Sequence, residues 1–140
     1  MEQRDYLLRE IEKIGMVIRA IRQKLFGGTD ELAVTVEAPA EALKEMLKNE
    51  AFIDLDELVA MDPAATDEYL SGMKGFNTEN IELLAATLAD IGLTGTSADS
   101  TLLLQKALHL YEICSLRDRT YSFAREAQIK RIRESLGNGI

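Results

Sequence analysis

The sequence of 140 residues contains no tryptophan, one cysteine, one histidine and two prolines. A single cysteine, Cys114, excludes an internal disulfide, as expected for a protein in a reducing cytosol. A single histidine, His109, argues against a zinc centre, because such centres use three or four ligands that usually include several His or Cys. Cys114 and His109 lie five residues apart on one expected helix, and this spacing does not bring them together for nucleophilic catalysis.

Other kinds of site are missing as well. The glycine pairs of the sequence lack the lysine and the strand-to-helix context of a phosphate-binding loop. The acidic segment 54–68 does not match a calcium loop, because Leu58 and Val59 stand where an oxygen ligand and a glycine are required. We therefore predict that the protein is not an enzyme and that it carries no catalytic residue, no cofactor and no metal.

Long hydrophobic runs are also absent. No apolar stretch approaches the length that a membrane span requires, and the first residues, MEQRD, lack the charged-then-apolar pattern of a secretory signal. Together with the single cysteine, these features predict a cytoplasmic protein. Few prolines and many Leu, Ala and Glu residues favour helices over strands.

The net charge of −8 is unevenly distributed. Residues 1–26 have a net charge of +2, residues 27–116 of −13 and residues 117–140 of +3. An acidic middle disfavours nonspecific binding of nucleic acid by the body of the protein. Basic ends leave two interpretations open: they are solvated helix faces, or they contact acidic surfaces.

The first expected helix, residues 3–26, has aliphatic side chains at alternating steps of four and three residues. These are Leu7, Ile11, Ile14, Ile18, Ile21 and Leu25. Such spacing is typical of a coiled-coil seam about three heptads long. Further apolar residues widen the face beyond a strict seam, which favours packing into a bundle or onto a partner. We predict a possible homo-oligomer through this helix, with packing onto its own domain as the alternative.

The predicted domains are the N-terminal amphipathic helix 1–28 and a helical domain 29–140. Residues 29–38 alternate like a strand without a visible partner and are read as an extended linker. Short helices are expected over 39–73, where Pro39, Asp54 and Asp62 are the start signals. Three longer helices are expected over 77–136. Their boundaries are marked by Asn77 or Thr78, by Gly92 and Gly95, by Ser97 or Thr96, by Asp118, and by Gly137.

The run LLQKALHLYE, with Ala107 and Leu108 at its centre, resembles the second helix of a tetratricopeptide repeat. Leu84, Leu88 and Ile91 then fall near the large positions of the first helix of that repeat. Leu88 and Ser100 stand where the motif usually has glycine and alanine. The resemblance covers about 55 residues and implies a helical hairpin of the protein-binding kind. The whole chain is also similar to small uncharacterised bacterial helical proteins, a likeness that implies no activity.

One group of side chains is a candidate interaction surface near the turn between the last two helices. It combines three aromatic and three arginine residues: Tyr111, Tyr121, Phe123, Arg117, Arg119 and Arg125. Aromatic and arginine side chains dominate the energetics of protein interfaces. The alternative is that the aromatic rings close the end of the hairpin while the arginines face water.

These observations predict an all-α protein, an irregular bundle of six or seven helices that ends in a tetratricopeptide-like hairpin plus one C-terminal helix. The function expected is that of a non-catalytic protein-interaction or assembly module with an unknown protein partner. Two alternatives remain: a regulator that contacts nucleic acid through the basic C-terminal helix, and a small ligand-binding protein.

Overall fold

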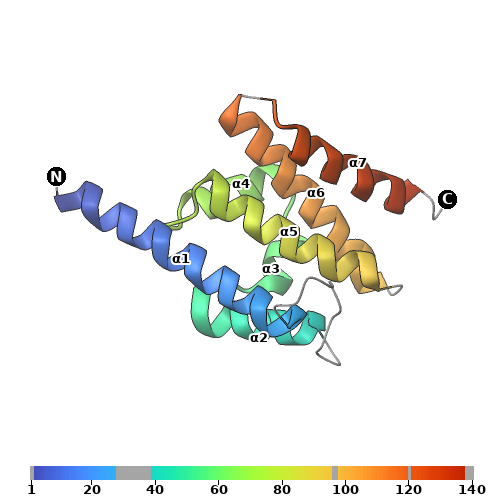
Figure 1. Ribbon diagram of the computed structural model, residues 1–140, viewed down its shortest axis with the longest axis horizontal. Helices are drawn as coiled ribbons and strands as arrows, with labels where there is room; N and C mark the ends of the chain where they lie inside the picture. The colour runs from blue at the N-terminus through green and yellow to red at the C-terminus, as the bar shows by residue number, and fades with distance from the viewer. Residues whose placement is uncertain (1, 28–38, 96–97, 120, 138–140) are drawn as a thin grey trace. The chain divides into compact units, whose positions relative to one another are not determined.

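The computed structural model describes residues 2–27, 39–95, 98–119 and 121–137 (Figure 1). Over these ranges it contains seven α-helices and no strand, so the predicted all-α fold is confirmed. The helices are α1 (Glu2–Phe26), α2 (Pro39–Ala51), α3 (Leu55–Ala60), α4 (Pro63–Ser71), α5 (Thr78–Thr94), α6 (Ala98–Asp118) and α7 (Phe123–Gly137). No helix among the described residues is both long and apolar enough to cross a membrane.

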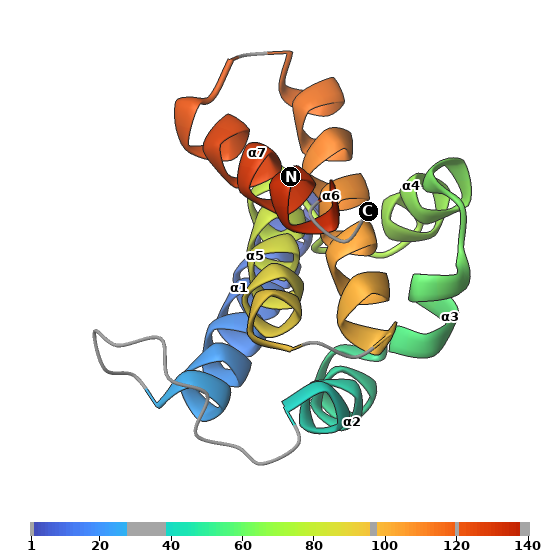
Figure 2. The same cartoon turned by 90° about the vertical axis from the view of Figure 1, so that its right-hand side faces the viewer.

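The chain divides into two compact units, Met1–Asn80 and Ile81–Ile140. This division falls at a different position from the boundary expected after residue 28. In the first unit α1 lies against α2, and α2 lies against α3 (Figures 1 and 2). The buried aliphatic side chains of the first unit include Ile14, Ile18, Ile21, Leu25, Leu43, Leu47, Ile53, Leu55, Leu58 and Leu70.

The helices of the first unit begin and end where local chemistry favours it. Gly27 adopts a left-handed φ of 75° and closes α1. Pro39 opens α2, where its fixed φ suits the first turn. The carboxylate of Asp54 accepts a 3.1 Å hydrogen bond from the amide of Glu57, and that of Asp62 accepts one of 2.7 Å from Ala65. The three predicted starts of the short helices are therefore confirmed.

A close approach fixes α1 against the segment that precedes α5. The side-chain amide of Asn80 donates to the backbone carbonyls of Ile11, at 2.9 Å, and Gly75, at 2.6 Å. Gly75 has a φ of 94°, and a Cβ on it would lie 2.6 Å from the carbonyl oxygen of Glu10. Only glycine fits both the conformation and the space. The Asn77 side chain caps α5 by accepting a 3.0 Å hydrogen bond from the Asn80 amide, which confirms one of the two predicted caps.

In the second unit α6 and α7 pack side by side in opposite directions (Figures 1 and 2). Of the two glycines predicted to end α5, Gly95 directly follows its last residue, Thr94, whereas Gly92 is buried within the helix. A Cβ at this position would lie 2.8 Å from Cγ of Leu104. The glycine is therefore a site of close helix packing, and it does not end the helix.

The predicted start of α7 at Asp118 is wrong. Asp118 is the last residue of α6, and α7 begins at Phe123 after Ser122. The Ser122 hydroxyl accepts a 3.2 Å hydrogen bond from the Arg125 amide and takes the capping role. Tyr121 and Ala124 are exposed, whereas Ile129 and Ile132 are buried. The predicted linker 29–38 and the predicted caps Thr96 and Ser97 lie outside the described residues.

Candidate functional site

The connection between α6 and α7 presents three large apolar side chains to solvent, which we call the aromatic tip: Leu116, Tyr121 and Phe123. Their exposed fractions are 77%, 70% and 81%. The rings of Tyr121 and Phe123 meet edge to face, with centroids 4.8 Å apart and an interplanar angle of 84°. Such a pair holds each ring in a defined orientation and leaves most of its surface available.

The backbone of this connection bends sharply at Arg119. Arg119 has a φ of 58°, in the left-handed region that residues with a Cβ seldom adopt. Its amide donates a 3.2 Å hydrogen bond to the carbonyl of Ser115 and so ends α6. The Arg119 side chain is exposed, next in sequence to the tip. The bend places Tyr121 and Phe123 outside the helical core instead of on the buried face of α7.

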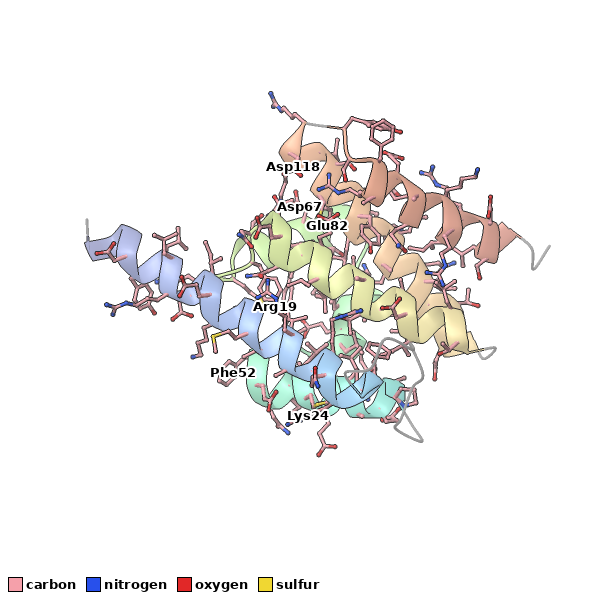
Figure 3. The ribbon with its side chains drawn as sticks, viewed as in Figure 1. Arg19, Lys24, Phe52, Asp67, Glu82 and Asp118 are labelled. Carbon is pink, nitrogen blue, oxygen red and sulfur yellow. The ribbon has the colours of Figure 1, made fainter. Side chains whose placement is uncertain are left out.

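The second unit also contains an ion-pair network around one buried arginine, which follows the tip in the sequence. Arg125 is 4% exposed, and its guanidinium donates to Glu82 through Nε, at 2.9 Å, and through Nη2, at 3.2 Å. Nη2 also donates to Asp118 at 2.6 Å. The hydrogen bonds to Glu82 hold the pKa of Arg125 above its ordinary value. Figure 3 shows Glu82 on α5 and Asp118 at the end of α6, so one arginine ties three helices together.

This arrangement separates the six residues of the predicted aromatic and arginine group. Tyr111 and Arg125 are buried, and Arg117 is partly exposed. Arg119, Tyr121 and Phe123 are at the surface. Tyr111 and Arg125 therefore belong to the interior of the second unit. Arg119, Tyr121 and Phe123 are accessible to a partner.

Sequence reasoning missed Leu116 as a member of the tip and Glu82 as a partner of Arg125. A signal for the buried arginine was present: Arg125 lies four, seven and eleven residues before the apolar members of α7, which are Ile129, Ile132 and Leu136. That spacing places Arg125 on the same helix face as the core residues. A buried arginine then requires carboxylate partners.

The predicted seam of α1 is divided by the structure. Ile14, Ile18, Ile21 and Leu25 are buried within the chain. Ile11 is partly exposed, and Leu7 is 46% exposed. Leu7 is thus the exposed member of the predicted seam, and Tyr6, Leu8 and Met16 are further exposed apolar side chains of α1.

The surroundings of Cys114 and His109 shift the pKa values of both side chains. Burial, followed by the negative charge of Glu82, raises the pKa of the Cys114 thiol to about 12, so it is protonated at neutral pH. Burial and the nearby Lys106 lower the pKa of His109. Lys106 is itself buried but takes part in interactions within the chain. No group of three or more His, Cys, Asp or Glu among the described residues is placed to hold a metal ion.

Comparisons with protein-family models, with curated proteins and with solved structures give no significant match. The resemblance of α5 and α6 to a tetratricopeptide repeat therefore stays a prediction, and the function is argued from the residues of the chain alone.

Proposed function

We propose that the chain is a non-catalytic protein-interaction or assembly module and that the aromatic tip is its contact surface. The observation that carries the proposal is the exposure of Tyr121 and Phe123, at 70% and 81%, beside a connection that a buried ion-pair network holds in place. Rigid aromatic side chains bury a large area at a small cost in conformational entropy, which is why they are frequent at the centres of interfaces.

The charges around the tip indicate the chemistry of its partner. The charged residues between Leu116 and Tyr121 are Arg117, Asp118 and Arg119, and Arg119 is exposed two residues before Tyr121. The acidic Asp118 is already paired with Arg125. A surface that combines apolar rings with an excess of positive charge is complementary to a protein surface with apolar side chains bordered by carboxylates.

A regulator that contacts nucleic acid through α7 is the second candidate, and it has weaker support. Arg125 is buried and neutralised by two carboxylates, so it does not contribute to a basic surface. Glu126 and Glu134 lie four residues before and after Lys130, where they reduce the positive potential of the exposed face. A ligand-binding protein would need a pocket with convergent polar groups.

The proposal is tested by affinity capture from a lysate of the native host with three baits, followed by quantitative mass spectrometry. The baits are the unaltered chain, the double variant Tyr121→Ser/Phe123→Ser, and Leu102→Ser. Leu102 is 45% exposed on α6 and serves as the matched control for loss of an exposed apolar side chain. We expect the unaltered chain and the control to retain the same proteins and the double variant to lose them. Equal retention on all three baits would show that the tip is not the contact surface.

A further inference from the structure

A further exposed aromatic residue, Phe52, lies in the first unit immediately after α2. Its side chain is 78% exposed, and its φ of 58° is in the left-handed region. Figure 3 shows it at the outer edge of the ribbon. The following residue, Ile53, is fully buried, and its amide donates a 3.0 Å hydrogen bond to the carbonyl of Leu47. The fold therefore needs Ile53 and the turn, whereas glycine is the residue favoured at position 52.

Carboxylates surround Phe52 along the chain. Segment 39–71 contains nine acidic and two basic side chains, a net charge of −7. Glu50, Asp54, Asp56 and Glu57, all within five residues of Phe52, are exposed. Lys44 forms an ion pair with Asp56, and Lys24 lies 3.9 Å from Glu50, so the neutralisation is partial. We call Phe52 with these four carboxylates the acidic face.

We propose that the partner of the aromatic tip is the acidic face of a second copy of this chain. This inference rests on the proposed function of the tip and names its occupant. The tip offers aromatic rings beside exposed Arg119, and the acidic face offers one aromatic ring among four carboxylates. Each surface thus has the charge sign and the apolar centre that the other requires.

At both surfaces the chain turns through a left-handed residue that carries a side chain, where glycine would fit the same turn without the steric cost of a Cβ. Phe52 and Arg119 are the two non-glycine residues with positive φ among the described residues, and both are exposed. Backbone strain of this kind is characteristic of segments that present side chains to a ligand or partner. The two strained positions lie on the two surfaces that we pair.

Because the tip and the acidic face are different surfaces, the contact joins unlike patches on two copies. After one contact forms, one copy still has a free acidic face and the other a free tip. Further copies therefore add as the protein concentration rises, unless the chain of copies closes into a ring. The overall charge of −8 opposes association of copies, and the local complementarity must overcome it. We therefore expect weak, concentration-dependent assembly.

The experiment is sedimentation of the purified chain over a range of concentrations, with two variants. One variant, Tyr121→Ser/Phe123→Ser, removes the tip, and the other, Phe52→Ser, removes the centre of the acidic face. The unaltered chain, of 15.6 kDa, is expected to exceed the mass of a dimer as concentration rises. Each variant alone is expected to stay monomeric. An equimolar mixture of the two variants retains one complete contact and is expected to form a dimer and no larger species.

Two exposed residues that belong to neither surface provide controls: Leu102→Ser and Leu7→Ser are expected to assemble like the unaltered chain. Circular dichroism verifies that all variants keep their helices. Association of either surface variant alone, or a mixture that remains monomeric, contradicts the pairing. Loss of assembly in Leu7→Ser alone would assign self-association to α1 instead. If the unaltered chain is monomeric at every concentration, the pairing of the two surfaces is wrong. That result does not decide whether the tip binds another protein, which the affinity capture tests.

Discussion

Glu82 accepts two hydrogen bonds from the guanidinium of Arg125, from Nε at 2.9 Å and from Nη2 at 3.2 Å, although the two residues are 43 positions apart in the sequence. A two-point contact of this kind fixes both the distance and the orientation of the partners. Arg125 lies two residues after Phe123, so the pair also determines how α7 leaves the aromatic tip.

We expect Glu82→Gln to lower the free energy of unfolding by up to about 3 kcal/mol, since removal of one partner from a buried ion pair typically costs about 3–5 kcal/mol and Asp118 remains here. Glu79→Gln, on the same helix but exposed, is the matched control. Denaturant unfolding monitors both variants. The loss of unfolding free energy caused by Glu82→Gln must also be smaller in an Arg125→Met background. In that background no guanidinium charge is left without its partner. Equal effects of Glu82→Gln in both backgrounds would show that the pair contributes nothing to stability.

Local signals allowed the sequence to predict much of the fold. The side chains of Asp54, Asp62 and Asn77 cap helices through amides three residues away, so a short window contains all the information. No short stretch of sequence identifies the partner of Arg125, because Glu82 is 43 residues away. Its helix phase indicates burial, but the partner Glu82 is brought close only when α5 and α7 have packed in the same unit.

Two errors have the same origin. Glycine often ends helices, but the role of Gly92 depends on Leu104, twelve residues further on. Aspartate often starts helices, but the carboxylate of Asp118 is engaged by Arg125. In each case a tertiary contact overrode a local preference. The exposure of Phe52 was missed because its strain appears only in the backbone conformation.

A matched pair of substitutions on α1 separates core from surface. Ile18 is 1% exposed and Leu7 is 46% exposed, although both were predicted members of one seam. We expect Ile18→Ala to reduce the free energy of unfolding by about 2–5 kcal/mol, as loss of a buried aliphatic side chain does. For Leu7→Ala we expect a change within about 0.5 kcal/mol. Denaturant midpoints measure both. A small effect at Ile18 would mean that its side chain is not packed in the core of the first unit.

A second matched pair tests the close packing at Gly92. Alanine normally stabilises a helix interior by about 1 kcal/mol relative to glycine. At Gly92 we expect the opposite sign, because the added Cβ would lie 2.8 Å from Cγ of Leu104 and 3.0 Å from the carbonyl oxygen of Ser100. Gly72→Ala meets no atom closer than 3.5 Å and should be neutral or stabilising. Thermal melts compare the variants, and a Gly92→Ala chain that melts higher than the unaltered protein would refute the close approach.

The thiol of Cys114 makes stability depend on pH in the alkaline range. Its ordinary pKa of 9.0 applies to the unfolded chain, whereas burial raises the pKa to about 12 in the folded one. Below pH 9 the thiol is protonated in both states, and its contribution to stability is complete. Above that pH the unfolded state loses the proton first, so stability falls with rising pH by up to about 1.4 kcal/mol per unit until about pH 12.

The variant Cys114→Ala removes this term but leaves other alkaline titrations unchanged. We therefore expect the difference in free energy of unfolding between the unaltered chain and Cys114→Ala to decrease from about pH 9 to about pH 10. Urea unfolding at both pH values measures it. A constant difference would show that the thiol is accessible to water, and rapid labelling by a thiol reagent in native buffer would show the same.

Phe52→Gly is expected to change stability and assembly in opposite directions. Glycine adopts the φ of 58° at this position without the steric cost of about 1–2 kcal/mol that a Cβ brings. The lost ring is 78% exposed, so little buried area is given up. Greater freedom of glycine in the unfolded chain offsets part of the gain, and we expect a net stabilisation of about 0.5–1 kcal/mol.

Assembly of the Phe52→Gly variant should nevertheless be lost, because the aromatic centre of the acidic face is gone. Thermal melts at low concentration and sedimentation at high concentration measure the two effects on one sample. If the variant is stabilised and still assembles, Phe52 does not contribute to the contact between copies. If the variant is destabilised, the ring packs against its own unit.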